Sequence, residues 1–107
     1  MIEAILKKYE SIADLCRRHG VAKLEVFGSA ARESDFDPAT SDLDFAVEFA
    51  PSAPGTSFRQ LLALQDDLSS LFGRKVDLVE IKNVKNPYIL KTILEDKRAV
   101  YESSNQK

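Results

Sequence analysis

The stretch VAKLEVFGSAAR (residues 21–32) decides the fold of this chain together with DLDFAVEF (residues 42–49). Apolar and polar side chains alternate in both stretches. Because successive residues of a strand point to opposite faces of a sheet, this alternation predicts two strands. The first strand ends at Gly28, and residues 29–32 are expected to form a brief helical turn. The pattern therefore predicts a strand, a Gly-Ser turn and a second strand.

Two aspartates stand at the start of the second strand, on the face opposite to Leu43 and Phe45. Residues two apart in a strand are about 6.5 to 7 Å apart at Cα and point the same way, so Asp42 and Asp44 project together. Aspartate is disfavoured in strands. Two like charges about 6 Å apart at an effective dielectric constant near 20 repel by roughly 2 to 3 kcal/mol. A bound divalent cation would reverse that interaction, so the pair predicts a metal site.

A third aspartate interrupts another apolar run. KVDLVEI (residues 75–81) is predicted to be a strand beside the DLDF strand, with Asp77 among its apolar residues. Three carboxylates converging from two strands can hold two Mg²⁺ ions about 3.5 to 4 Å apart, which is a geometry of phosphoryl transfer. One ion would hold the triphosphate of a nucleotide and the other would activate an attacking hydroxyl. Asp77 is then the natural base or nucleophile-side ligand.

The Gly-Ser turn offers an anion-binding element beside these carboxylates. Gly28 at the end of a strand lets the backbone approach a phosphate closely, and the helical turn that follows presents unpaired N–H groups. Ser29 can add a hydroxyl donor. Arg32, one turn later, is placed either to meet phosphate as a fork of donors or to pair with a neighbouring carboxylate, Glu33 or Asp35.

These motifs together resemble the minimal nucleotidyltransferase (MNT) family of the polymerase-beta superfamily. The residues that carry the resemblance are Gly28-Ser29-Ala30-Ala31-Arg32, Ser41-Asp42-Leu43-Asp44-Phe45-Ala46-Val47, Val76-Asp77-Leu78-Val79 and Val100-Tyr101-Glu102. The resemblance implies an α+β (α/β) fold, in which a small mixed β-sheet carries helices packed on one face and leaves an open active face. The sequence departs from many relatives at Glu33, where they have a glycine.

The resemblance also implies a site and a partner. Asp42 and Asp44 would bind the metal, Mg²⁺ or Mn²⁺, with Asp77 as third ligand or base. Gly28 and Ser29 would bind the phosphates of ATP. Proteins similar to this one act as antitoxins of HEPN-domain toxins, and in characterised pairs the MNT protein transfers AMP from ATP to a tyrosine of the toxin. The acceptor site is then expected to be completed by another chain.

Three helices are predicted around the strands. Ser57 forms a capping box at the start of the second helix, which Gly73 ends, and Asn86 with Pro87 opens the third. The first helix is expected to end at Gly20, because the residues before it show apolar side chains at three-and-four spacing: Ile2, Ile5, Leu6, Tyr9, Ile12, Ala13 and Cys16.

Length and composition narrow the class of protein. The 107 residues allow one domain, 1–107, and 44% hydrophobic with 30% charged residues describes a globular chain. The pattern of Ala99–Tyr101 favours a small edge strand, and Ser103–Lys107 are expected to fray. A net charge of −2 argues against duplex DNA binding by the chain alone. One cysteine and one histidine exclude a Cys/His metal site, and no apolar run suits a membrane span, so a cytoplasmic protein is expected.

Three functions remain open at this level. The first is a metal-dependent adenylyltransferase that modifies a protein partner in a toxin-antitoxin pair. The second is an adenylyltransferase for a small hydroxylated molecule such as an aminoglycoside. The third is an antitoxin that neutralises its partner by binding alone, with an idle nucleotide site. The residues do not give the nucleotide preference, the acceptor, the number of nucleotides transferred or the oligomeric state.

Overall fold

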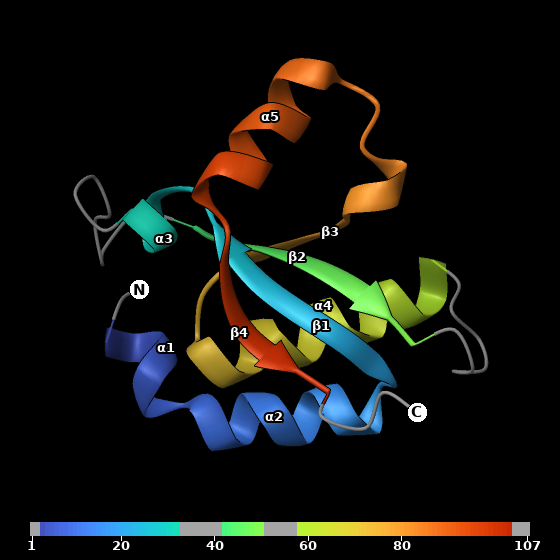
Figure 1. The fold of residues 1–107 in the computed structure, drawn as a ribbon. Coiled ribbons are helices and arrows are strands. Elements are labelled where there is room, and N and C mark those ends of the chain that lie inside the picture. Colours follow the sequence, from blue (N-terminus) through green and yellow to red (C-terminus); the bar gives the residue numbers. More distant parts are fainter. Residues whose placement is uncertain (1–2, 33–41, 51–57, 104–107) are drawn as a thin grey trace.

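A computed structural model of the chain describes residues 3–32, 42–50 and 58–103. Helices and strands alternate along it, and two short helices precede the first strand (Figure 1). In chain order the elements are α1 (Glu3–Lys7), α2 (Tyr9–Arg18), β1 (Val21–Phe27), α3 (Ser29–Arg32), β2 (Leu43–Phe49), α4 (Phe58–Phe72), β3 (Val76–Glu80), the 3₁₀ helix η1 (Ile81–Asn83), α5 (Pro87–Asp96) and β4 (Arg98–Glu102).

The four strands form one mixed sheet in the order β3-β2-β1-β4. β1 pairs antiparallel with both β2 and β4, whereas β2 and β3 run parallel. The register sets Asp44 opposite Phe27 of β1 on one side and opposite Asp77 of β3 on the other. This sheet with its packed helices confirms the predicted α+β class.

The hydrophobic core lies between the sheet and helices α2 and α4, which cover one face (Figure 1). Phe45 of β2 is fully buried and its ring lies 6.1 Å from that of Phe72 in α4. The amide of Leu78 in β3 donates a 3.2 Å hydrogen bond to Gln65 Oε1, which also joins α4 to the sheet. Helix α5 lies on the opposite side of the sheet, and its Ile93 is buried.

The helix ends show where the sequence was informative. Gly20 and Gly73 follow their helices at φ of 70° and 65°, as the predicted stops require. Asn86 Oδ1 accepts hydrogen bonds from the amides of Tyr88 and Ile89, which confirms the predicted cap of α5. The capping box at Ser57 lies outside the described residues. None of the helices in the described part of the chain is long and apolar enough to cross a membrane.

The prediction of one continuous N-terminal helix was wrong. The chain forms α1 and α2 with a turn at Lys8, whose amide donates a 3.2 Å hydrogen bond to the Ile5 carbonyl. The spacing of apolar residues does not reveal this break, because the pattern continues through it: Ile5 before the turn and Ile12 after it are both buried. At the other end, Ser103 is tied down: its amide donates a 2.8 Å hydrogen bond to Ala22 O, and residues 104–107 lie outside the described residues.

Candidate active site

Two of the predicted carboxylates meet where β2 and β3 run side by side. Asp44 and Asp77 are register partners in the parallel pair, and the charge of Asp77 raises the pKa of Asp44. Residues opposite each other in neighbouring strands point to the same face, which here is the face away from α2 and α4. The pair is therefore a concentrated acidic centre on the sheet.

The environment of Asp44 disfavours its charged form. Burial, as the largest cause, and the neighbouring charges of Asp77 and Asp42 together raise its pKa from 3.8 to about 6. Arg32 acts in the opposite direction and lowers the pKa of Asp44. A group whose pKa is raised by burial and by like charges is typical of functional sites, although structural networks can also cause such shifts. A cation beside Asp44 would remove this cost.

Asp42 lies just before β2 and has a cation as a neighbour. Its Oδ2 is 3.9 Å from Nζ of Lys75, at the start of β3. Accordingly, within residues 3–32, 42–50 and 58–103, no three His, Cys, Asp or Glu side chains are gathered closely enough to hold a metal ion. The donor set itself fits a divalent cation, because three carboxylates supply the oxygen ligands that Mg²⁺ and Mn²⁺ prefer and because Asp44 and Asp77 already share a face.

Gly28 is packed against the carboxylate of Asp44. Its φ is +72°, and a Cβ placed on it would lie 2.7 Å from Asp44 Oδ2. Its carbonyl accepts hydrogen bonds from the amides of Ala31 and Arg32. These bonds form the turn of α3, which begins at Ser29. The sequence predicted the Gly-Ser turn from the end of a strand, and the structure brings this turn to the acidic centre. Phosphate binding by Gly28 and Ser29 stays a prediction.

Arg32 reaches a partner that sequence reasoning missed. Its guanidinium Nη1 donates a hydrogen bond to Oδ2 of Asp96 at the end of α5, and the two side chains form an ion pair. The two residues are 64 positions apart, and no local pattern marks Asp96 among the other acidic residues. The sequence-based alternatives, Glu33 and Asp35, lie outside the described residues. Arg32 is thus held at the site by a different element from the one that carries it.

A second buried charge on this face was also missed. Glu25 of β1 is only 7% exposed, and its Oε2 lies 3.2 Å from Lys97 Nζ and 3.6 Å from Lys23 Nζ. Glu25 is the register partner of Ala46, so it shares a face with Asp44 two residues along β2. A cavity of about 570 Å³ opens beside it, between the sheet, η1 and α5, with Leu94 and Lys97 in its lining.

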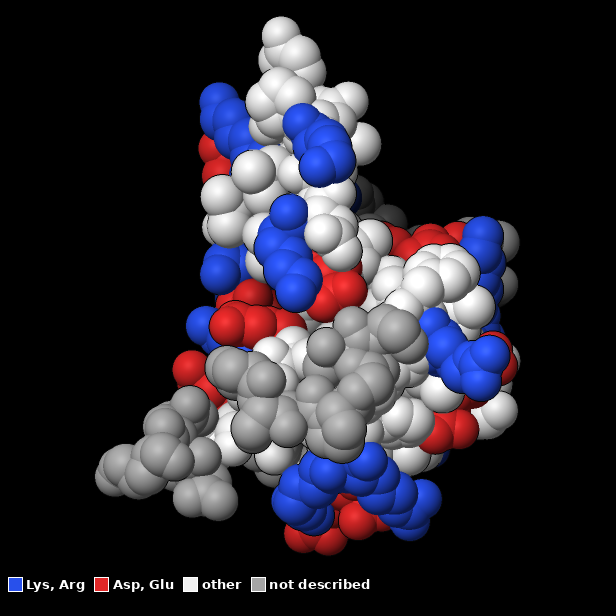
Figure 2. Space-filling view, turned by 90° about the vertical axis from the view of Figure 1, so that its right-hand side faces the viewer, with Lys and Arg blue, Asp and Glu red and all other residues white. Residues whose placement is uncertain are grey.

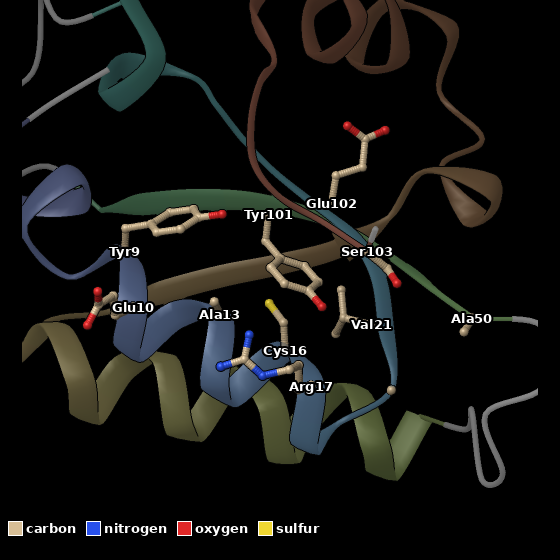
Figure 3. Close-up of a pocket in the computed structure, with 11 residues that line it drawn as sticks. Tyr9, Glu10, Ala13, Cys16, Arg17, Val21, Ala50, Tyr101, Glu102 and Ser103 are labelled. Carbon is tan, nitrogen blue, oxygen red and sulfur yellow. The ribbon is translucent and has the colours of Figure 1, made fainter. Parts of the chain in front are cut away.

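A cavity of about 880 Å³ lies on the other side of the sheet, between α2 and β4 (Figure 3). Its described lining includes Tyr9, Arg17 and Tyr101, but none of the predicted site residues. Figure 3 also shows Cys16 at this cavity, and burial raises the pKa of its thiol to about 12. Such a thiol is not a nucleophile at neutral pH, which agrees with the prediction that Cys16 is a core residue.

The carboxylate pair beside a Gly-Ser turn is matched by a known family. A sequence profile described as "Nucleotidyltransferase domain" fits residues 9–100, which include all six predicted site residues. The chain belongs to this family. The assignment confirms the resemblance drawn from the motifs, and it makes the chain a nucleotidyltransferase by family.

Known proteins agree with the assignment. A relative from Methanocaldococcus jannaschii, provisionally named a protein adenylyltransferase, is 40% identical over 95 residues, which cover 89% of this chain and 90% of the relative. A solved structure described provisionally as a minimal nucleotidyltransferase shares 30% identity with a TM-score of 0.71, over 90% of this chain and 92% of that one. A structure of a tri-AMPylated Shewanella oneidensis HEPN toxin in complex with an MNT antitoxin matches at a TM-score of 0.65 and 18% identity, over 92% and 73%, and supports the fold alone.

Proposed function

We propose that this nucleotidyltransferase transfers AMP from ATP to a hydroxyl group of a protein, and that the acceptor is a tyrosine of a HEPN-domain toxin for which this chain is the antitoxin. The transfer of AMP is supported above all by the two register partners Asp44 and Asp77, which lie beside Gly28. The protein acceptor is supported by the 40% identical relative that is named a protein adenylyltransferase. The toxin is supported by the family resemblance and by the shared fold of the HEPN–MNT complex.

The carboxylates and the Gly-Ser turn have separate roles in this transfer. Asp42, Asp44 and Asp77 would hold one or two Mg²⁺ ions, with Mn²⁺ as a substitute. When bound, a divalent cation neutralises phosphate charge and makes an attacking hydroxyl more acidic. Gly28 and Ser29 would bind the phosphates of ATP, because a backbone without a Cβ can approach an anion closely.

The reaction follows from those positions. The oxygen of the acceptor hydroxyl attacks the α-phosphorus of ATP and forms a P–O bond. The bond between the α-phosphorus and the bridging oxygen breaks, and pyrophosphate leaves. Asp77 takes the proton of the hydroxyl, in the role of base that the family resemblance implies for it. The chain's main contribution is to hold both reactants in line and to stabilise the charge of the transition state.

An exposed apolar helix beside the site supports a protein acceptor. On α5, Tyr88 is 82% exposed and Ile89 is 53% exposed, and Leu94 next to the 570 Å³ cavity is also exposed. Residues 81–94, which include this surface, contain three lysines and no acidic residue. In Figure 2, the part that stands above the body, formed by α5, is mainly white with scattered blue side chains. A partner chain could cover these side chains while it reaches the carboxylates.

The test uses purified chain with ATP labelled at the α-phosphate and Mg²⁺. A purified HEPN-domain protein serves as acceptor, with its tyrosines replaced by phenylalanine one at a time as controls. Label on the toxin, lost with one tyrosine, would support the proposal. Label on an added aminoglycoside alone would favour the small-molecule enzyme. Toxin inhibition without any label would show an antitoxin that acts by binding.

A further inference from the structure

Two consecutive residues join the end of α5 to the face that carries Asp44. Asp96 is bonded to Arg32 of α3, and Lys97 Nζ lies 3.2 Å from Glu25 Oε2 of β1. The two pairs have opposite polarity, since α5 supplies the acid in one and the base in the other. Helix α5 also buries Ile93. Its end is therefore positioned on this face by charge.

The pair of Asp96 and Arg32 restricts the guanidinium. The Asp96 side chain is 18% exposed and that of Arg32 is 41% exposed, so the acid is the more deeply set member. Asp96 contacts Nη1 through one carboxylate oxygen. An arginine carries five N–H donors in a rigid plane, so this contact fixes the direction of the plane without itself using every donor.

Arg32 also belongs to the turn that contacts the carboxylates of the site. Its amide donates a 3.1 Å hydrogen bond to Gly28 O, and a Cβ on Gly28 would lie 2.7 Å from Asp44 Oδ2. The turn that carries the guanidinium is thus packed against the acidic pair. A cation in that position is suited to meet a phosphate that binds beside Gly28.

We propose that Asp96 is a positioning residue, which holds the Arg32 guanidinium beside Asp44 so that it can bind a phosphate of the nucleotide. This inference rests on the proposed function for the presence of a nucleotide. It makes the end of α5 a part of the nucleotide site, although α5 is far from the Gly-Ser turn in sequence.

A purely structural role for Asp96 is the competing account, and the second pair offers the matched comparison. Lys97→Met removes one of the two attachments of α5 without touching Arg32, and Glu25 keeps Lys23 at 3.6 Å. If Asp96 served only to attach α5, Asp96→Asn and Lys97→Met would have similar effects. Glu95→Gln, on the same turn and exposed, controls for loss of a negative charge from the helix end.

The experiment measures the affinity of each variant for a non-hydrolysable ATP analogue with Mg²⁺, by calorimetry, alongside its melting temperature. We expect Asp96→Asn to weaken binding about tenfold, as the loss of one charge-assisted hydrogen bond at a phosphate would. Lys97→Met should lower the melting temperature with an affinity within about twofold of the parent, and Glu95→Gln should change neither. Asp96→Glu, which keeps the charge, should restore most of the affinity.

A double-mutant cycle separates positioning from independent effects. Arg32→Met and the double variant Arg32→Met/Asp96→Asn should bind the analogue equally weakly, because Asp96 acts through Arg32. Additive losses, unchanged affinity in Asp96→Asn, or tighter binding in that variant would overturn the proposal. If Asp96→Asn does not fold, Asp96→Ser takes its place in the affinity measurement and in the cycle with Arg32→Met. Analogue binding without label transfer to any protein would refute the proposed function and leave this inference standing, whereas a parent that binds no nucleotide refutes both.

Discussion

Asp44 and Asp77 stand opposite each other in the parallel register of β2 and β3, so the two carboxylates share one face of the sheet. A sheet gains nothing in stability from two adjacent acids, because their charges repel and burial removes water from them. In the metal-free protein this cost is seen in the pKa of Asp44, which burial and the neighbouring acids raise to about 6. The arrangement is thus better suited to a cation than to the protein alone.

The first prediction concerns the metal-free stability of Asp44→Asn. The asparagine amide keeps the shape of the side chain and can donate a hydrogen bond to Asp77, while it removes one charge. We expect the free energy of unfolding at pH 7.5 to be unchanged or higher by about 1 kcal/mol, after allowance for the solvent that screens this half-buried group. Chemical denaturation in EDTA measures it. A variant that unfolds would show that the carboxylate is structural and would sink the site assignment.

The second prediction is the pH dependence of that difference. The folded pKa of Asp44, about 6, lies above the value of about 3.9 for an unfolded aspartate, so the folded state binds the proton more tightly. The destabilising effect of Asp44 is therefore absent below about pH 4 and grows as the pH rises to about 6. The stability of Asp44→Asn minus that of the parent should be near zero at pH 4 and reach its plateau by pH 7. Thermal unfolding of both proteins in EDTA across this range gives the curve, and a difference that shrinks with rising pH would contradict it.

The third prediction concerns ligand-linked stability. Ligands that bind only the folded state raise the melting temperature in proportion to the logarithm of their concentration over Kd. Mg²⁺ with ATP should therefore stabilise the parent but not Asp44→Asn, which lacks a ligand for the metal. Asp66→Asn, at an exposed position of α4, is the matched control, and its melting temperature should rise as that of the parent does. Equal stabilisation of all three proteins would mean that the nucleotide binds elsewhere.

Local sequence patterns predicted most of the fold. The alternation of apolar and polar residues predicted β1, β2 and β3. Gly20 and Gly73 predicted the helix ends, and both have a positive φ in the structure. These features depend on neighbours in sequence, and so they can be derived without the fold. The break at Lys8 escaped because the apolar spacing continues through it. The strand order β3-β2-β1-β4 depends on how the whole chain packs, which no local pattern encodes.

The carboxylates of the acidic centre were predictable from the sequence, whereas the ion pairs around them were not. Asp44 and Asp77 stood out because charges inside apolar strands are unfavourable without a function. Arg32 was recognised as a candidate, but its bond to Asp96 spans 64 residues. Lys97 and Glu25 are 72 residues apart. Surface-type residues such as these are common in any sequence, so only the folded structure shows which of them meet.

The fourth prediction tests the turn that contacts the acidic centre. Gly28→Ala places a methyl group 2.7 Å from Asp44 Oδ2 and also forces alanine to φ of +72°. Gly73→Ala imposes similar backbone strain at φ of +65°, but nothing lies within 4 Å of its new Cβ. Backbone strain of this kind costs about 1 kcal/mol or somewhat more, so we expect that loss in Gly73→Ala, with nucleotide affinity unchanged. Gly28→Ala should lose at least as much stability and should also lose nucleotide binding by more than about tenfold, because the carboxylate must move to accommodate the methyl group. Denaturation and calorimetry of the two variants side by side measure this, and equal behaviour of the two would show that the contact between Gly28 and Asp44 has no role in binding.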